Sequence, residues 1–287
     1  MMEYNKKVYF ISFENVEGIN FSISQNSYHP VVDVAIRDKI VDRYMEFFNI
    51  SIHNGFSANM DSIFIDKSII LKVSSIEFFE VFLFNNFRKL DDSFINYLKR
   101  NSDYDILKYY YNIVENYNVM IDSNKNINLF LQNASMPKPL AISVMVRTVD
   151  NKYLITKRPM SLAVGSGLSS VSVTGAIEMD DFNSPNPFIE CANRELYEEL
   201  NIKVSPENIN ILGMGVGKIK MQPVIIMNVD TELTSTEVLN KSSNAKEYSL
   251  EVSEIQAVDI IDLKKLYEKN NFTEIGGFHI ETILQKI

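Results

Sequence analysis

The chain has 287 residues, of which 46% are hydrophobic and 23% charged, with a formal net charge of -9 at pH 7. This composition is that of a soluble globular protein, and it excludes a disordered chain. The acidic charge argues against general binding to nucleic acid or to an anionic membrane, because both require a basic surface. A chain of this length predicts two domains of ordinary size.

Cysteine content and hydropathy predict where the protein works. The one cysteine, Cys191, excludes an internal disulfide framework and fits a reducing compartment. The N-terminus becomes polar too soon for a secretory signal, and no apolar run approaches the roughly 18 residues of a membrane span. We therefore expect a cytoplasmic protein with no membrane partner.

Residues 1–135 are predicted to form an α+β N-terminal domain of unassigned role. Alternating β-branched and aromatic residues predict its strands, and apolar residues at helical spacing predict its helices. The expected strands are 8–13 and 19–24, joined around Gly18, and then 63–65 and 69–71; the expected helices follow Pro30 and cover 76–87, 92–98 and 105–117. We find no site chemistry in this half, and an unassigned domain makes a homodimer a reasonable expectation.

The predicted domain boundary is the segment Asn133-Ala134-Ser135-Met136-Pro137-Lys138-Pro139. Two prolines one residue apart favour an extended connector, because each disfavours helix and central strand. The second domain is therefore expected over residues 136–287. It opens with two strands, 140–146 and 153–156, and the second strand leads into Lys157 and Arg158.

A glycine turn at Gly175 and a strongly acidic helix follow this hairpin. If residues 191–200 are helical, Glu195, Glu198 and Glu199 share one face at i, i+3 and i+4. Arg194 can offset only part of their mutual repulsion. A hard divalent cation such as Mg²⁺ would offset the rest, because it accepts carboxylate oxygens and bridges to phosphate. The alternative interpretation is a solvated acidic helix face.

This pattern resembles the Nudix box, G-x5-E-x7-R-E-U-x-E-E-x-G-U, where U is aliphatic. The matching residues are Gly175, Arg194, Glu195, Leu196, Glu198, Glu199 and Ile202. Two positions differ: Asp181 replaces a glutamate and is separated from Arg194 by twelve intervening residues instead of seven, and Asn201 replaces a glycine. A longer loop costs little, because closure entropy grows logarithmically with length. Asparagine is the next best residue for the left-handed position that ends a helix.

The resemblance implies an α/β/α sandwich with a mixed sheet for the second domain. It also implies hydrolysis, dependent on Mg²⁺ or Mn²⁺, of the pyrophosphate linkage in a nucleoside diphosphate joined to another group. The expected partner is therefore a small nucleotide. A second hypothesis is a Nudix-like sensor, which binds a nucleotide metabolite without cleaving it.

The resemblance further implies roles for individual residues. Glu198 and Glu199 are the expected metal ligands, Glu195 is a further ligand or the base that orients water, and Arg194 holds the glutamates. The weaker candidates are the carbonyl of Thr174 and the side chain of Glu178 as ligands, Lys157 and Arg158 as phosphate contacts or solvated strand ends, and one of Glu247, Glu251 and Glu254 as an additional carboxylate.

The remainder of the chain is predicted to complete the sheet. The run Gly213-Met214-Gly215-Val216-Gly217-Lys218 lacks the spacing of a P-loop, and we interpret it as a strand close to a neighbouring backbone. Strands are expected at 223–229 and 251–258, a turn and variable loop at 231–238, and helices at 261–268 and 280–287. His279 is expected to be structural.

Overall fold

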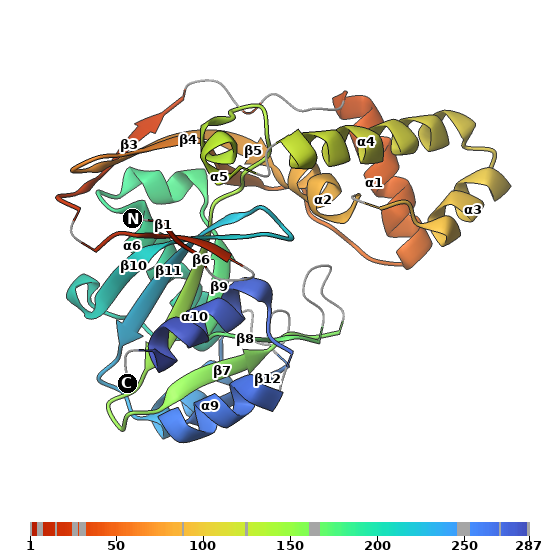
Figure 1. Cartoon of the computed structure of the whole chain (residues 1–287). Helices are drawn as coiled ribbons and strands as arrows, with labels where there is room; N and C mark the ends of the chain where they lie inside the picture. The colour runs from red at the N-terminus through yellow and green to blue at the C-terminus, as the bar shows by residue number, and fades with distance from the viewer. Residues whose placement is uncertain are drawn as a thin grey trace. The chain divides into compact units, whose positions relative to one another are not determined.

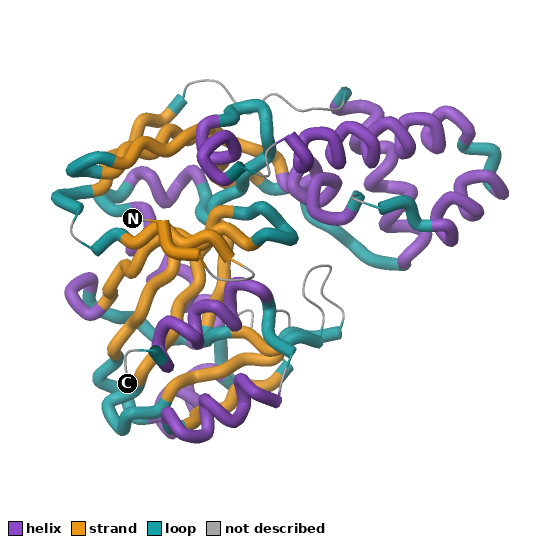
Figure 2. The backbone as a smooth tube through the Cα atoms, in the orientation of Figure 1, coloured by secondary structure: helices purple, strands orange, loops and turns teal. Residues whose placement is uncertain are grey.

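The computed structural model describes residues 2–4, 8–14, 16–24, 28, 33–87, 89–123, 126–160, 167–245, 253–269 and 271–285 (Figures 1 and 2). The chain divides into two compact units. We call Met1–Asn15 together with Leu140–Ile287 the box unit, because it contains the box residues. Val16–Pro139, which lies between the two parts of the box unit in the sequence, is the insert unit.

The first two strands predicted, which we expected to be joined around Gly18, lie in different sheets. Strand β2 (Val8–Ser12) pairs with β10 (Ile209–Gly217) of the box unit, whereas β3 (Ile19–Ile23) pairs with β5 (Ile69–Glu77) of the insert unit. The boundaries consequently differ from a division at residue 135. Local alternation predicts that a segment is extended, but it does not select the segment's partner.

The box unit is built on a mixed sheet in the order β1-β2-β10-β11-β6-β7-β12, with β8 paired to β7 and β9 paired to β6. Its central pair, β11 and β6, is parallel, and the pairs on either side are antiparallel. The remaining strands are β1 (Met2–Tyr4), β6 (Ala141–Arg147), β7 (Tyr153–Lys157), β8 (Ser169–Ser170), β9 (Val173–Ala176), β11 (Pro223–Asp230) and β12 (Glu254–Val258).

Helices cover both faces of this sheet. On one face, Met145 of β6 packs in a core cluster with Leu263 of α9 (Ile260–Lys269) and Ile280 of α10 (Glu274–Leu284). Figure 1 shows α10 crossing the strands. Successive side chains of β6 point to opposite faces of the sheet. Ile142 and the other even-numbered residues of β6 therefore face α6 (Pro187–Leu200), on the side opposite Met145. The predicted α/β/α sandwich with a mixed sheet is confirmed.

Two helices of the box unit differ from the prediction. Residues 231–238 were expected to be a turn and loop, but helix α7 (Ser235–Ser242) begins there, with Thr234 and Glu237 forming a capping box. Helix α10 begins at Glu274, several residues before the predicted start. The pair Gly276-Gly277 lowers helix propensity, yet Gly276 is needed because a Cβ there would lie 2.5 Å from the Thr273 hydroxyl.

The close approach predicted for the glycine-rich strand β10 is confirmed at Gly213. This residue has φ 159°, and a Cβ built on it would lie 2.2 Å from the carbonyl oxygen of Ile11 on β2. Glycine therefore allows the N-terminal strand to pair closely with β10.

In the part of the insert unit that the structure describes, a three-stranded sheet in the order β3-β5-β4 is combined with five helices. The short strands predicted at 63–65 and 69–71 are parts of β4 (Phe56–Ile65) and β5, and the helix predicted from 76 begins two residues later. Aromatic rings from different helices, such as Tyr44, Phe87 and Phe94, pack together in the core. The helices are α1 (Val34–Phe48), α2 (Phe78–Asn86), α3 (Asp92–Arg100), α4 (Tyr104–Ser123) and α5 (Ile127–Gln132).

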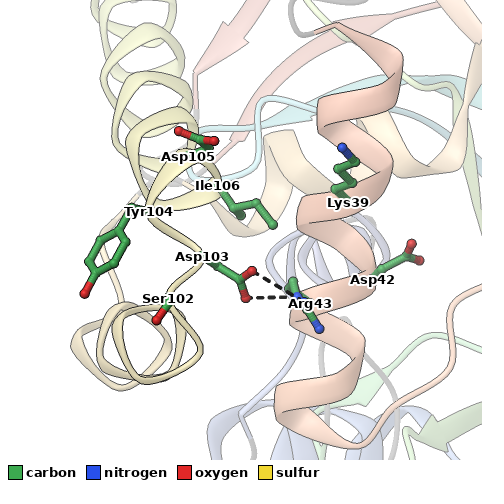
Figure 3. A pocket seen from close by; sticks show the side chains of 8 residues that line it. All are labelled: Lys39, Asp42, Arg43, Ser102, Asp103, Tyr104, Asp105 and Ile106. Carbon is green, nitrogen blue, oxygen red and sulfur yellow. Dashed lines mark hydrogen bonds and ion pairs between the residues drawn. The ribbon is translucent and has the colours of Figure 1, made fainter.

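A cavity of about 480 Å³ lies between α1 and the turn from α3 to α4. Figure 3 shows Arg43 of α1 facing Asp103 of the turn, and the Arg43 Nε atom lies 3.0 Å from Asp103 Oδ2. Lys39, Asp42 and Asp105 bring both signs of charge to the same lining. The ion pair therefore links two helical segments. The lining carries both positive and negative side chains, so the cavity does not favour a ligand of one charge.

A fully buried amine lies at the end of the insert unit. Lys138 Nζ donates to the carbonyl oxygens of Asp61, at 2.7 Å, and Phe130, at 3.1 Å. It also lies over the Phe130 ring. Burial lowers the pKa of Lys138 to about 7, although the negative charge of Asp61 acts to raise it.

Among the described residues, no helix is both long and apolar enough to cross a membrane.

The lowered pKa of Lys138 predicts a pH-dependent stability. The folded-state pKa lies below the ordinary value of 10.5, so the unfolded chain binds more protons between about pH 7 and 10.5. Stability therefore rises with pH across this window, by up to about 1.4 kcal/mol per pH unit. In urea denaturation followed by circular dichroism, we expect wild type to gain stability relative to Lys138→Met as pH rises. Parallel pH profiles of the two proteins would contradict the prediction.

Candidate functional site

The lengthened segment before the acidic helix is mainly helical, although we predicted a loop there. A 3-10 turn, η1 (Met179–Asn183), is followed by α6, which begins at Pro187 and not near Cys191. The Asn186 side chain accepts hydrogen bonds from the backbone N–H groups of Phe188 and Ile189. Asparagine before the helix and proline at its first position are favourable start signals. Residues 187–190 thus form a first turn of α6 that lies before the predicted helix.

The end of α6 is as predicted. Asn201 has φ 54° and ψ 38°, which is the left-handed conformation, and its N–H group bonds to the carbonyl of Tyr197. Asparagine tolerates this conformation better than other residues with a side chain. The departure from glycine therefore leaves the helix stop intact.

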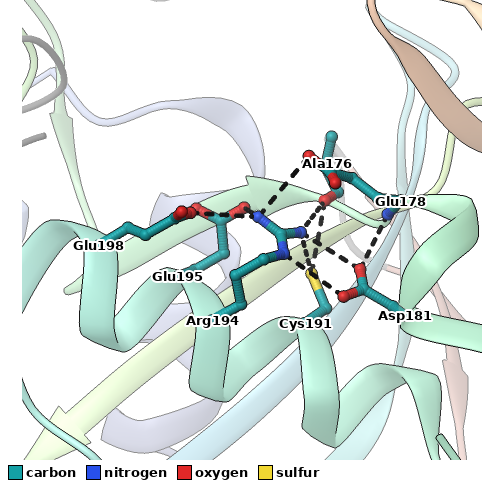
Figure 4. Close-up of polar contacts among 7 residues, drawn as sticks. All are labelled: Ala176, Glu178, Asp181, Cys191, Arg194, Glu195 and Glu198. Carbon is teal, nitrogen blue, oxygen red and sulfur yellow. Dashed lines mark hydrogen bonds and ion pairs between the residues drawn. The ribbon is translucent and has the colours of Figure 1, made fainter. Parts of the chain in front are cut away.

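Arg194 lies at the centre of the polar contacts in Figure 4. Its Nη1 atom donates to Glu195 Oε1 at 2.7 Å and to Glu198 Oε2 at 3.4 Å. Its Nη2 atom donates to the carbonyl oxygen of Ala176 at 2.9 Å and to Asp181 Oδ2 at 3.2 Å. Burial alone would lower the pKa of Arg194, but Asp181 and Glu195 raise it above its ordinary value. The guanidinium therefore stays charged.

Asp181 anchors this arginine from a buried position. Only 4% of the residue is exposed, and its second oxygen also accepts from the backbone N–H of Glu178 at 2.8 Å. Glu178 in turn lies at the edge, 3.9 Å from Arg194 Nη1. The sequence identified Asp181 only as a departure from the box. Its place six residues after Gly175 was the available signal for this role.

Gly175 allows the Glu195 side chain to lie directly on strand β9. A Cβ built on Gly175 would lie 2.0 Å from Glu195 Cδ and 2.1 Å from its Oε1. Any larger residue would therefore move the carboxylate. Because Gly175 pairs with Ile142 of β6, Glu195 lies on the α6 face of the sheet.

The three predicted carboxylates differ in exposure. Glu195 and Glu199 are buried, at 8% and 4% exposure, whereas the Glu198 side chain is 24% exposed. One guanidinium contacts Glu195 and Glu198 together. Within the described ranges, no group of three or more His, Cys, Asp or Glu residues is placed to hold a metal ion. The structure thus joins two of the predicted ligands through Arg194.

Arg158 is the predicted phosphate contact that the structure brings near Gly175. Its Nη1 atom donates to Thr174 Oγ1 at 3.1 Å, and Thr174 immediately precedes Gly175. Lys157 is exposed and pairs in register with Glu254 of β12, whose side chain accepts from Gln256. Glu247 and Glu251 lie outside the described residues.

Comparisons with known proteins give structural likeness alone. No family model matches the chain, and no curated protein matches it. Solved structures of Nudix and MutT family proteins are similar to about half of the chain.

Three of these structures illustrate the match. A MutT protein from Methanosarcina mazei Go1 is 18% identical, with a TM-score of 0.37, and the match covers 52% of this chain and 95% of that chain. A mutT/nudix family protein from Listeria innocua is 14% identical, with a TM-score of 0.38 and coverages of 53% and 94%. The NUDIX domain of Shewanella oneidensis NrtR complexed with ADP ribose is 14% identical, with a TM-score of 0.37 and coverages of 53% and 89%.

The contact between Gly175 and Glu195 predicts the effect of a single methyl group. Gly175→Ala should lower the free energy of unfolding by about 1–3 kcal/mol, because it forces the Glu195 side chain out of its position. Gly277→Ala is the control, since a Cβ there would meet its neighbours at ordinary distances of 3.5 and 3.6 Å. Urea denaturation measures both variants. Equal free energies of unfolding for the two variants would contradict a close contact between Gly175 and Glu195.

The anchoring of Arg194 predicts a second pair of variants. Asp181→Ala removes acceptors from Arg194 and from the N–H of Glu178, and we expect a loss of about 2–3 kcal/mol in unfolding free energy. Asp180→Ala, at an exposed neighbouring position, should change stability by less than about 0.5 kcal/mol. Thermal denaturation of the two variants in parallel tests this difference, and a stable Asp181→Ala protein would contradict it.

Proposed function

We propose that the box unit is a hydrolase that cleaves the pyrophosphate linkage of a nucleoside diphosphate joined to another group, with Mg²⁺ or Mn²⁺ as the metal. The single observation that carries the proposal is the group formed by Arg194, Glu195 and Glu198 beside Gly175. An acidic protein that acts on phosphate needs local positive charge, and a bound metal ion can supply it.

The donor types suit such an ion, although the described side chains are not gathered around one position. Carboxylate oxygens are the hard ligands that Mg²⁺ prefers, and Glu198 and Glu199 would hold the metal. Glu195, the carbonyl of Thr174 and Glu178 are the further candidate ligands. When bound, the ion would neutralise phosphate charge, orient the bridge and acidify the attacking water.

Arg194 is held in a way that permits this role. Its Nη2 and Nε atoms bond to Asp181, and Nη2 also bonds to the carbonyl of Ala176, whereas Nη1 bonds to the glutamates. Glu198, the less buried of the two glutamates, can therefore turn from Nη1 toward an ion while Asp181 keeps the guanidinium in place. Arg194 is thus a positioning residue for the carboxylates.

The chain's other groups support binding and proton transfer. Glu195, against Gly175, is a candidate base that orients water or a further ligand. Arg158, bonded to Thr174 Oγ1, offers a guanidinium to phosphate oxygens near the same turn. Phosphoryl transfer is catalysed chiefly by positioning and charge stabilisation, which these groups would supply.

The experiment is a pair of conservative substitutions with a matched control. Glu198→Gln and Glu199→Gln should each lower metal-dependent release of mononucleotide by about 100-fold or more, because an amide is a weaker metal ligand than a carboxylate. Glu190→Gln, an exposed position in the first turn of the same helix, should leave turnover unchanged. The substrate panel includes ADP-ribose and related nucleoside diphosphate derivatives. Unchanged turnover in both site variants would exclude the assignment.

A second candidate function is a sensor that binds a nucleotide metabolite without cleaving it. The observation that favours it is the pairing of Glu195 and Glu198 with Arg194, which uses carboxylates that a hydrolase would direct to metal. Calorimetry with ADP-ribose, with product formation followed in the same sample, separates the two functions. Saturable binding without product would select the sensor, and turnover would select the hydrolase.

A further inference from the structure

A second cavity of the box unit lies away from the carboxylates and has a volume of about 330 Å³. It is found where the central parallel strands end, because Arg147 is the last residue of β6 and Asp230 is the last residue of β11. Ile283 of α10 also lines it. The ends of parallel strands are frequent ligand sites in α/β folds.

Strand register separates this cavity from Gly175 and Glu195. Gly175 pairs with Ile142, near the start of β6, and the side chain of Ile142 faces α6. Met145, which lines the cavity, is three residues after Ile142, so its side chain points to the opposite face, where it packs with α10. The cavity is therefore on the other face of the sheet, about 10–16 Å further along the strand.

Two carboxamides stand side by side in the cavity. Asn210 of β10 and Asn228 of β11 are register partners on adjacent antiparallel strands, and both line the cavity. Side chains that are directly opposite lie on the same face, with Cβ atoms about 5 Å apart. Each carboxamide offers two N–H donors and an oxygen acceptor. The pair can therefore match a ligand edge on which donors and acceptors alternate.

A buried chain of hydrogen bonds fixes the orientation of Asn228. His279 is fully buried, and burial lowers its pKa to about 3, so its ring is neutral near pH 7. Its Nε2 atom lies 3.0 Å from Asn228 Oδ1, and its Nδ1 atom lies 3.0 Å from Ser143 Oγ. The Asn228 oxygen must accept, so Nε2 carries the proton and the Ser143 hydroxyl donates to Nδ1. The Nδ2 amino group is then the part of Asn228 left for a ligand.

The charged groups of the lining neutralise each other. Arg147 Nε lies 2.8 Å from Asp230 Oδ1, and Arg147 Nη2 lies 3.0 Å from Asp230 Oδ2, which is a bidentate pair. A phosphate would meet the charge of Asp230 and would have to compete for the guanidinium. The lining therefore favours an uncharged ligand.

The remaining lining residues are apolar or aromatic. Tyr153 supplies a ring, while Met145 and Ile283 supply aliphatic surface. A planar heterocycle can stack on such a ring and present its polar edge to the amides. The volume is at the low end for ligand sites, which suits a molecule of this size.

We propose that this cavity binds a nucleobase, free or as part of a phosphate-free nucleoside, through Asn210 and Asn228. Asn228 Nδ2 donates to a ring carbonyl or ring nitrogen, and the Asn210 carboxamide pairs with the neighbouring edge of the base. The site is independent of hydrolysis at the α6 carboxylates. His279 acts as a positioning residue, because it holds the Asn228 amide without reaching the ligand.

Calorimetry on the full chain tests the proposal. Adenosine, guanosine, cytidine and uridine are titrated separately, up to about 5 mM, in buffer with EDTA, so that no divalent ion supports binding at the carboxylates. We expect saturable binding of at least one nucleoside at one site per chain. The corresponding monophosphate should bind no more tightly than its nucleoside. Absence of binding across the panel, or much tighter binding of the monophosphate, would overturn the proposal.

Two variants locate the binding. Asn210→Ala removes one amide from an exposed position, and Asn228→Asp removes the amino group while keeping an acceptor for His279 Nε2. Each should weaken nucleoside binding by about tenfold, which is the value of one hydrogen bond. Asn20→Ala, at an exposed strand position of the insert unit, is the matched control and should bind as wild type does. Circular dichroism confirms folding of each variant. Unchanged affinity in both cavity variants would place the ligand elsewhere and reject the site.

Discussion

The contacts of Arg194 are the interaction on which the acidic half of the box unit depends. Three glutamates on successive turns of one helix repel each other, and Asp181 adds a fourth carboxylate from η1. The guanidinium can satisfy several of them because it has five donors in a rigid planar fork. It also bonds to the carbonyl of Ala176 on β9. One side chain therefore holds helix, strand and turn together in an otherwise repulsive region.

This arrangement links stability to the proposed chemistry. Asp181 is buried and contacts two of the arginine's nitrogen atoms, so the arginine does not rely on the glutamates for its position. Glu195 is confined by Gly175 below it and by Arg194 beside it. A carboxylate confined in this way loses little side-chain entropy when it engages a ligand, which is the physical basis of a preorganised site.

Patterns within one helix were the most predictable part of the site. Spacing alone placed Glu195, Glu198 and Glu199 on one face of α6, and the left-handed Asn201 at its end is observed. Features that depend on distant partners could not be predicted in this way. The alternation of β2 indicates a strand, but its partner β10 lies about 200 residues later in the chain. The start of α7 is different, because its capping box is a local signal that lies within the helix's own sequence.

The path of β6 explains how one sheet can offer two chemically different sites. Near its start, β6 pairs with β9, whose Gly175 admits a glutamate from α6 on one face. Near its end, the opposite face presents Met145 beside Asn228, and the amide of Asn228 is fixed by a neutral histidine from α10. Period-two alternation keeps these environments apart, because successive side chains of a strand cannot share a face. Unbalanced negative charge is thus concentrated on the α6 side, while the α10 side combines apolar packing with uncharged amides and with the mutually paired charges of Arg147 and Asp230. An uncharged ligand on the second face would consequently feel little of the field of the carboxylates, since the packed sheet lies between them.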